Sequence, residues 1–365
     1  MVYKVIGLMS GSSLDGLDIV LAEITEDRGS WSFEIMAADC YPYDGVWKDR
    51  LQGATSLNAM DYALLHTDYG HYLGQQVVRF IENNNLHYKA GFIASHGHTT
   101  FHLPGRRMTA QLGDGAAIAA ETGMTVISDL RALDVAFGGQ GAPIVPIGEK
   151  LFWKDYNLFL NLGGIANLSI NKPEGYIAFD VCAANRVLNL LAQKEGKEYD
   201  AGGEMSASGN INEDLLQQLN ALAYYGKAYP KSLANDFGTD EVFPLVEKAG
   251  LSTADALRTY TEHIAVQIAA AINNYAGFTT NTPQKLLLTG GGAFNTFLIK
   301  TLQQHLKPMN IEVVVPDEKL VAYKEALVMA LIGVLRWRQE YNVLSSVTGA
   351  ARDSIGGALW IGQEA

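Results

Sequence analysis

The chain has 365 residues, more than a single hydrophobic core usually serves, so its length predicts two domains. Its net charge of −12 argues against nucleic acid or an anionic membrane as a partner, but does not exclude a nucleotide held with Mg²⁺. The only cysteines are Cys40 and Cys182, which excludes a disulfide framework and fits a reducing cytoplasm. The longest apolar run, Ala326–Leu335, is too short to cross a bilayer. We therefore expect a cytoplasmic protein.

Two apolar strands joined by a small-residue turn are predicted within Val5–Ile24. Such a turn can approach a ligand closely and hold an anion with its N–H groups and hydroxyls. In a phosphate site Asp15 and Asp18 would face Mg²⁺, its waters or a substrate hydroxyl, because carboxylates repel phosphate oxygens. A Gly/Ser hairpin with Asp at its bend is the alternative, and no Walker-type motif is present. The small residues of the turn are Ser10, Gly11, Ser12, Ser13 and Gly16.

Three antiparallel strands followed by alternating helices and strands predict a mixed sheet covered by helices in the first third of the chain. After the first hairpin we expect a strand at Trp31–Ala38, a helix at Asp61–Asn83, a strand at Gly91–Ser95, a helix at Leu112–Gly123 and a strand at Thr125–Ser128. The Gly- and Pro-rich stretch Asp129–Pro146 is then predicted to be a loop that crosses between domains.

The same pattern returns about 150 residues later, which predicts an internal duplication. Ser252 and Asp255 are expected to cap the most regular helix of the chain. The elements predicted here are strands at Leu158–Leu162, Ile165–Ile170 and Tyr176–Asp180, a helix from Ala184, a helix at Thr253–Tyr275, a strand at Lys285–Thr289, a helix from Asn295, a strand at Ile311–Val315 and a helix at Lys324–Trp337.

Three glycine-marked turns each follow a buried strand, at Gly11–Gly16, Gly163–Gly164 and Gly290–Gly292. A glycine turn that leads into a helix suits the close approach of a phosphorylated ligand to the helix N-terminus. Because two of these turns lie in duplicated positions, we expect one nucleotide to be held between two related lobes.

The segment GLMSGSSLDGLD at Gly7–Asp18 closely resembles the GxMSGTSLDGxD opening of the anhydro-N-acetylmuramic acid kinases. The resemblance runs from residue 6 to about residue 360. The further motifs are HGHT (His96–Thr99), QLGD (Gln111–Asp114), GGQGAPIVP (Gly138–Pro146), NLGGIANLS (Asn161–Ser169), FD with a later Asn (Phe179, Asp180, Asn185), TGGGAFN (Thr289–Asn295) and SVTGA (Ser346–Ala350).

The resemblance implies an α/β protein of the actin-like ATPase fold, with two ribonuclease H-like lobes, mixed β-sheets and an interlobe cleft. We expect residues 1–128 with 345–365 to form the first lobe and residues 129–344 the second. The family's reaction is ATP- and Mg²⁺-dependent: water opens the 1,6-anhydro ring of anhydro-N-acetylmuramic acid, and O6 is phosphorylated to give N-acetylmuramate 6-phosphate during cell-wall recycling. A cytoplasmic homodimer is also implied.

By the same resemblance, Asp180 is the base that activates the attacking water; a helix cap is the alternative role for this residue. Glu325 is expected to contact the sugar, with a solvated helix-start glutamate as the alternative. The other residues expected at the sugar are His96, Arg131, Asp134 and Gln140. The residues expected at the nucleotide are Gly11, Ser12, Ser13, Leu14, Asp15, Gly16, Leu17, Asp18, Gly163, Gly164, Gly290, Gly291, Gly292 and Asn295, with Asp15 at the metal.

Two further points bear on function. His96, His98 and His102 could ligate zinc, but no fourth ligand recurs nearby, which favours loop histidines with ordinary partners. The family pattern is altered around the ligands, at DVCAAN (Asp180–Asn185), KSLAND (Lys231–Asp236) and VAYKEA (Val321–Ala326). A kinase for another sugar, or a nucleotide-binding protein without catalysis, therefore remains an alternative function.

Overall fold

The computed structural model describes residues 1–11, 14–172, 175–229, 231–234, 236–277 and 283–362. The chain forms two compact units, one of Met1–Lys154 with Tyr323–Ala365 and one of Asp155–Ala322. Residues 129–154 and 323–344 thus group with the first unit, whereas they were expected in the second. The reason is packing: the helix Glu318–Trp337, which contains the boundary at Tyr323, lies against the first sheet, and the Gly/Pro-rich loop hydrogen-bonds to Thr348 of the same unit.

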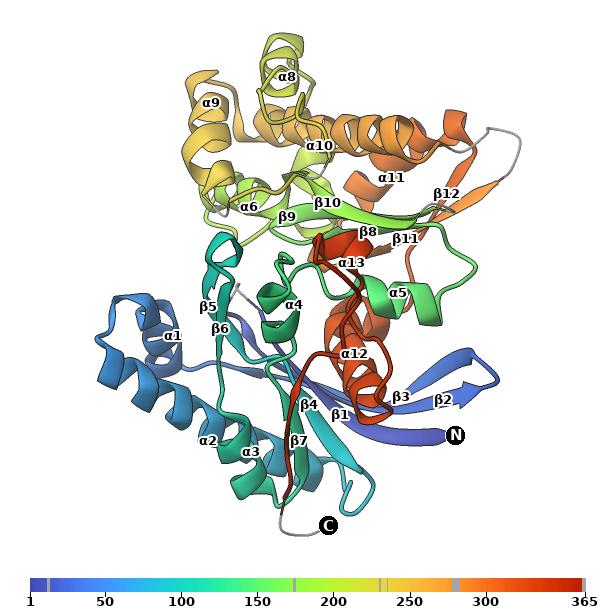
Figure 1. Cartoon of the computed structure of the whole chain (residues 1–365). Coiled ribbons are helices and arrows are strands. Elements are labelled where there is room, and N and C mark those ends of the chain that lie inside the picture. Colours follow the sequence, from blue (N-terminus) through green and yellow to red (C-terminus); the bar gives the residue numbers. More distant parts are fainter. Residues whose placement is uncertain (12–13, 173–174, 230, 235, 278–282, 363–365) are drawn as a thin grey trace. The chain divides into compact units, whose positions relative to one another are not determined.

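A six-stranded sheet with the strand order β13-β7-β4-β1-β2-β3 forms the centre of the first unit (Figure 1). The strands β1, β2 and β3 are antiparallel, whereas β4 runs parallel to β1 and β7 parallel to β4. The strand bounds are β1 (Val2–Ser10), β2 (Gly16–Asp27), β3 (Ser30–Pro42), β4 (Phe92–Ser95), β7 (Thr125–Ser128) and β13 (Ala358–Trp360), with a separate hairpin of β5 (His98–Leu103) and β6 (Met108–Leu112).

Helices cover both faces of this sheet. Ile6 and Leu8 on one face pack into a core with α2, while the intervening Gly7 faces α12, as the two-residue period of a strand requires. A Cβ on Gly7 would lie 2.0 Å from the carbonyl oxygen of Ala326. The helix α12 therefore approaches β1 so closely that only glycine fits at this position. The helices are α1 (Gly45–Gln52), α2 (Ala59–Asn83), α3 (Gly115–Thr122), α4 (Ala132–Ala136), α5 (Pro146–Phe152), α12 (Glu318–Trp337) and α13 (Ser345–Thr348).

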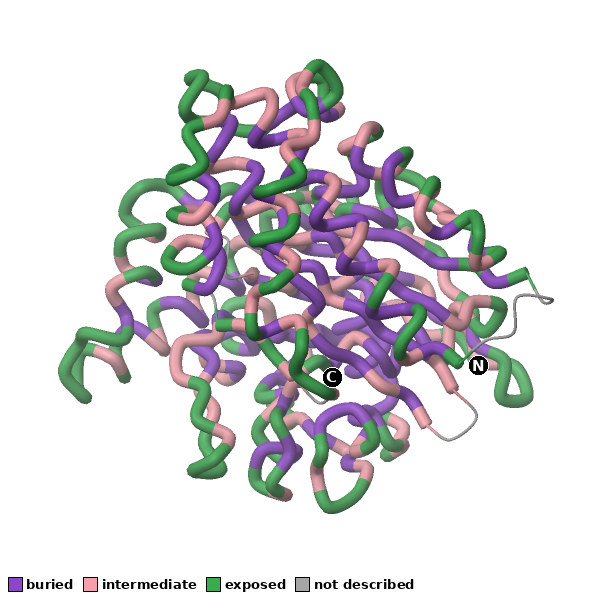
Figure 2. Tube along the Cα trace, turned by 90° about the horizontal axis from the view of Figure 1, so that it is seen from above, coloured by how far each residue is buried: buried purple, intermediate pink, exposed green. Residues whose placement is uncertain are grey.

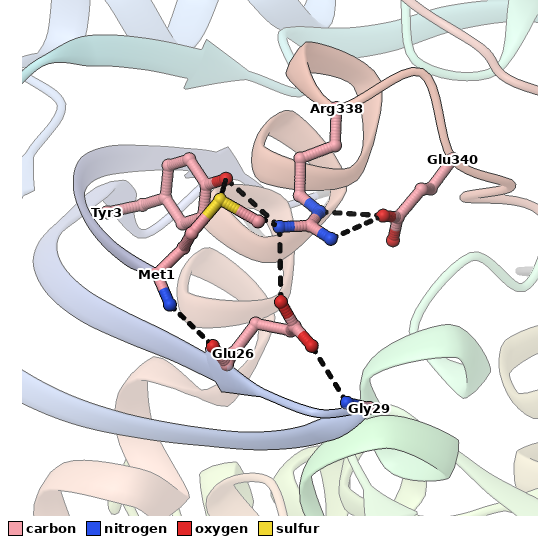
Figure 3. A network of polar contacts seen from close by, with 6 residues as sticks. All are labelled: Met1, Tyr3, Glu26, Gly29, Arg338 and Glu340. Atoms are coloured by element: carbon pink, nitrogen blue, oxygen red, sulfur yellow. Dashed lines mark hydrogen bonds and ion pairs between the residues drawn. The ribbon is translucent and has the colours of Figure 1, made fainter.

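A polar network ties the end of α12 to the first hairpin (Figure 3). The Arg338 guanidinium pairs with Glu26 at 3.3 Å and with Glu340 at 2.6 Å, and donates to the Tyr3 hydroxyl at 3.1 Å. The amino group of Met1 donates to the carbonyl oxygen of Glu26 at 2.6 Å. The segment just after α12 is thereby held to the same unit as the N-terminus of the chain.

The second unit is built on a five-stranded sheet with the order β10-β9-β8-β11-β12 and its own core. The helix α10 is capped as predicted, because the Ser252 hydroxyl accepts from Asp255 N–H at 3.1 Å. The buried stretches follow the strands, with exposed residues at the outer turns (Figure 2). The bounds are β8 (Leu158–Leu162), β9 (Ile165–Lys172), β10 (Gly175–Ala183), β11 (Gln284–Thr289), β12 (Ile311–Val314), α6 (Asn185–Gln193), α7 (Glu204–Ser208), α8 (Glu213–Asn220), α9 (Phe243–Lys248), α10 (Thr253–Tyr275) and α11 (Thr296–Leu306).

Both sheets have the same internal order, third-second-first-fourth-fifth, with three antiparallel strands followed by two parallel ones. This repeat confirms the predicted duplication and the α/β fold class of two related lobes with mixed sheets. The predictions missed several short elements, among them α1, β5 and β6, because a segment of five to eight residues shows too few periods to detect. No helix in the described ranges is long and apolar enough to cross a membrane.

Candidate functional site

The turn between β1 and β2 lies at the carboxyl end of the first strand, as predicted. Ser12 and Ser13 lie outside the described residues. Leu14 adopts a φ of +59°, a left-handed conformation that is rare for a residue with a side chain, so this turn is tightly constrained. Gly16 is required sterically, because a Cβ there would lie 2.7 Å from the carbonyl oxygen of Tyr41.

Asp18 is the acid of this turn with the most perturbed electrostatics. It lies on β2 opposite Cys40 of β3, whose thiol hydrogen-bonds to it. The pKa of Asp18 is raised to about 6: burial is the largest cause, the charges of Glu325 and Asp15 add to it, and the hydrogen bond from Cys40 opposes it. Three carboxylates therefore repel one another at this end of the first unit. Within the described ranges no three His, Cys, Asp or Glu side chains form a group that could hold a metal.

The Ser10 hydroxyl, expected from sequence to help hold an anion, is buried and bonded within the protein. It accepts from Tyr43 at 2.8 Å and from Tyr69 at 3.0 Å, and lies 3.2 Å from Nδ1 of His98. Neither tyrosine was predicted as a partner of Ser10, because both come from segments far from it along the chain. This buried network fixes the last residue of β1, directly before the turn.

His96, Arg131 and Glu325 come together in the first unit. His96 Nδ1 lies 2.8 Å from the carbonyl oxygen of Gly97, and its Nε2 accepts from Arg131 Nε at 2.7 Å, so the proton is on Nδ1. Burial, and then the Arg131 charge, lowers the pKa of His96 to about 3. Burial lowers the pKa of Arg131 to about 10, opposed by Glu325 and Asp134, so this guanidinium is charged at neutral pH.

Glu325 is not a solvated glutamate at a helix start. It lies within α12 rather than at its first turn, and burial raises its pKa, opposed by the charges of Lys324 and Arg131. Lys324 itself forms a buried ion pair with Glu149 at 2.7 Å. Glu325 is therefore a half-buried acid whose charge is felt by Lys324 and Arg131.

Asp134 and Gln140, which were also predicted to contact the sugar, differ from each other in burial and in hydrogen bonding. Asp134 is fully buried, and its carboxylate accepts from Gly141 N–H and from the Thr348 hydroxyl, both at 2.8 Å. Gln140 has an exposed side chain, and its N–H donates to the carbonyl oxygen of Thr348 at 2.8 Å. Asp134 thus fixes the glycine-rich loop to α13.

The zinc interpretation of the three histidines gains no support from their contacts. His98 lies beside Ser10, and His102 Nδ1 lies 3.1 Å from the Thr109 hydroxyl. With His96 bonded to Gly97 and Arg131, each imidazole has a protein partner. His98 and His102 belong to the strand β5 rather than to the predicted loop.

Asp180 lies at a β-bulge in β10, within the second unit. One carboxylate oxygen accepts from the Asn167 side-chain amide and the other from Leu233 N–H at 2.8 Å. The helix cap interpretation is wrong, because α6 begins after Ala184 and has no side-chain cap. Burial raises the pKa of Asp180, opposed by these two donors. A raised pKa moves a carboxylate toward the range in which it acts well as a general base.

Cys182 lies two residues beyond Asp180, and the sequence left open whether its thiol is reactive. It is fully buried, and burial raises its pKa. A thiol held protonated in an apolar core is inert and behaves as a small hydrophobic residue.

The two glycine turns of the second unit pack on each other and on the start of α6. Gly290 has a φ of +85°, and a Cβ there would lie 2.4 Å from Asn161 Oδ1. Asn185 donates from Nδ2 to the carbonyl oxygen of Leu162 at 2.9 Å and faces Gly292 with its Oδ1. Gly163, Gly164, Gly291 and Gly292 thus join in one backbone surface with few side chains, which suits a nucleotide.

Asn295 caps α11 by accepting from Leu298 N–H at 3.0 Å. A second glycine pair approaches it, since a Cβ on Gly203 would lie 2.3 Å from Asn295 Oδ1. Both Gly202 and Gly203 have positive φ angles, +60° and +74°. Adjacent glycines are a visible signal in the sequence, but this pair was not singled out there.

The comparisons with known proteins cover nearly the whole chain. A family model for anhydro-N-acetylmuramic acid kinase matches residues 3–362. The chain is similar to the protein of that name from Francisella tularensis subsp. novicida, 34% identical over 370 residues that cover 94% of this chain and 95% of the relative. It is also similar to the protein of that name from Gloeobacter violaceus, 34% identical over 369 residues, with 95% and 96% covered.

Among solved structures, the chain is similar to an activator of 2-hydroxyisocaproyl-CoA dehydratase from Clostridium difficile with bound ADPNP. The TM-score is 0.47 at 14% identity, with 93% of this chain and 97% of that one covered.

Proposed function

The chain belongs to the anhydro-N-acetylmuramic acid kinase family, and on this premise we propose that it phosphorylates anhydro-N-acetylmuramic acid with ATP while opening its 1,6-anhydro ring with water. The product would be N-acetylmuramate 6-phosphate. The observation that carries the proposal is the family match over residues 3–362, joined to an Asp180 carboxylate that is held by two donors and caps no helix.

In the proposed reaction, Asp180 accepts a proton from the water that attacks C1 of the sugar. The bond between C1 and O6 breaks, and its electron pair stays on O6. That oxygen then bonds to the γ-phosphorus of ATP, and ADP leaves. Such a transfer depends mainly on positioning and charge neutralisation. The Asn167 amide and Leu233 N–H support this role by fixing the direction of the carboxylate.

For the nucleotide, we assign the phosphates to the turn of Gly11 and Leu14–Asp18 and to Gly163 and Gly164. The adenosine is assigned to Gly290–Gly292. Mg²⁺ fits the acids of the first turn, because the charges of Asp15 and Glu325 act on the Asp18 carboxylate, whose pKa burial raises above all, and a cation would relieve both effects. Mg²⁺ is commonly held by one or two carboxylates together with substrate phosphates, so Asp15 and Asp18 suffice as protein ligands. When bound, the ion would neutralise phosphate charge.

For the sugar, we assign contacts to His96, Arg131 and Glu325. The Arg131 guanidinium suits the carboxylate of the lactyl group, because its fork geometry matches two oxygens. Neutral His96, with a pKa of about 3, can only donate or accept hydrogen bonds and adds no charge. Asp134 would act by positioning the loop that carries Gln140. We also propose a cytoplasmic homodimer, as the family resemblance implies.

The test is sugar-dependent ADP release with ATP and Mg²⁺, with the sugar product identified by mass. A product heavier by both phosphate and water, lost in Asp180→Asn, would support the proposal. A product heavier by phosphate alone would indicate a kinase for intact sugar rings. No sugar-dependent turnover would favour a nucleotide-binding protein without catalysis, an alternative raised by the altered DVCAAN, KSLAND and VAYKEA segments.

A further inference from the structure

Arg186 is a half-buried cation beside the glycine turn of the second unit. It follows Asn185 at the start of α6. A Cβ on Gly164 would lie 3.7 Å from Arg186 Nε and 3.9 Å from its second terminal nitrogen, so the guanidinium lies along the exposed turn. Across the described part of the chain, its side chain has no ion pair, hydrogen bond or ring contact. The charge of this half-buried guanidinium is therefore not paired within the described residues.

The backbone donors near Arg186 are already in use. Ala184 N–H donates to the carbonyl oxygen of Gly164 at 2.8 Å, and Asn185 N–H to that of Gly163 at 3.1 Å. A helix N-terminus usually offers such N–H groups to an anion. Because the turn consumes these two N–H groups, an anion at this place gains from a side-chain donor. Residues 181–184 have neither a hydroxyl nor a glycine, and the Asn185 amide donates to the carbonyl oxygen of Leu162, so Arg186 is the next side-chain donor along the chain.

The other turns assigned to the nucleotide supply no positive charge. The segment Gly11–Asp18 has two acids and no base, and neither Gly163–Gly164 nor Gly290–Asn295 contains a lysine or arginine. A triphosphate carries several negative charges, which one Mg²⁺ does not fully neutralise. A guanidinium matches phosphate oxygens with two parallel hydrogen bonds and remains charged at every physiological pH.

We propose that Arg186 binds phosphate oxygens of the nucleotide and supplies the positive charge at the Gly163–Gly164 turn. The proposal rests on the proposed function, because it takes the ligand to be the ATP of that reaction. It makes Arg186 a nucleotide-binding residue of the second unit, beside a turn that contains no cationic side chain of its own.

The experiment measures binding by titration calorimetry with Mg²⁺ and either a non-hydrolysable ATP analogue or adenosine. Arg186→Gln should weaken the binding of the analogue about tenfold to hundredfold and leave that of adenosine within about twofold, because only the analogue has phosphates. Arg186→Lys should restore part of the loss. Lys194→Gln is the control, since it removes a cation from the other end of α6 that pairs with Glu247 at 2.6 Å.

The proposal is overturned if Arg186→Gln binds the analogue as wild type does, or if it loses adenosine and the analogue equally, which would indicate a structural role. A loss that grows smaller with rising salt supports it, because an ionic contact is screened. If wild type binds the analogue but shows no sugar turnover, the proposed function fails and the Arg186 assignment stands. If wild type binds no nucleotide, both fail.

Discussion

The two units share one strand order but differ in the charges at the ends of their strands. In the first unit the turn after the first strand contains acids, and Asp18 has a pKa raised to about 6. In the second unit the corresponding turn is only Gly163 and Gly164, with the Arg186 cation beside it. The acid of the second unit, Asp180, lies instead on the third strand of its sheet, at a bulge.

This difference shows how a duplicated scaffold acquires distinct chemistry. In both units the strand order brings turns, helix starts and the carboxyl ends of parallel strands to one edge of the sheet, where ligands commonly bind. The local residues then decide what that edge can bind. Clustered acids favour a cation, whereas glycines with an unpaired arginine favour a phosphate.

The largest effect is expected from removing the acid of the second unit. Asp180→Asn should lower kcat for the sugar by about 10²- to 10⁴-fold, because the water loses its base, while nucleotide affinity changes little. The measurement is sugar-dependent ADP release beside calorimetric binding of the ATP analogue. The control is Tyr224→Phe, which removes only the hydroxyl that donates to the Asp180 carbonyl oxygen at 2.6 Å. Equal losses in both variants would contradict the base assignment.

A second prediction tests whether α12 belongs to the first unit. Gly7→Ala should lower the free energy of unfolding by about 3 kcal/mol, because its Cβ would clash with backbone atoms of α12. Gly45→Ala is the matched control: no atom lies within 4 Å of a Cβ there, and alanine favours the helix α1. Denaturant unfolding measures both. A Gly7→Ala protein as stable as wild type would contradict the close packing of β1 on α12.

A third prediction concerns the acid of the first unit. The folded state holds the Asp18 proton more tightly than the unfolded state, so this group favours folding most below pH 4. That stability is lost as the pH rises from about 4 to about 6, by about 3 kcal/mol for the shift from 3.8 to about 6. Asp18→Asn should therefore be more stable than wild type at pH 7.5, and equally stable near pH 4.

The measurement for Asp18 is denaturant unfolding across this pH range in EDTA. Asp27→Asn removes a carboxylate from the exposed end of the same strand, β2, and serves as the control for net charge. Parallel pH profiles for wild type and Asp18→Asn would show that Asp18 titrates normally. The shift predicted for Asp18 would then be wrong.

The smallest effect is expected at the network in Figure 3. Arg338→Gln should lower the Tm by about 2–4 °C, since it removes the charge that pairs with Glu26 and Glu340. The loss should shrink in 1 M salt, because surface pairs are screened. Lys4→Gln, which removes a more exposed pair with Glu23 on the same sheet, is the comparison. A salt-independent loss would point to packing of the arginine stem instead.

The sequence by itself determined the strand pattern and the places of the chemistry. Alternating or continuous apolar runs revealed both hairpins, and the span of α10 was predicted as Thr253–Tyr275, because long periodic segments depend mainly on local residues. Asp18 and the three glycine turns were recognised because small and acidic residues interrupt those runs. The family resemblance then predicted a role for each of them and pointed to Asp180 as the base.

Only the tertiary structure decided which distant residues meet. Ser10 with Tyr43 and Tyr69, His96 with Arg131, and Asp134 with Thr348 are far apart along the chain, and no local pattern encodes their contacts. The unit boundaries were also decided by packing rather than composition, because α12 must bury its apolar residues against the first sheet. Burial itself is a tertiary property, and it is burial that raises the pKa values of Asp18 and Asp180.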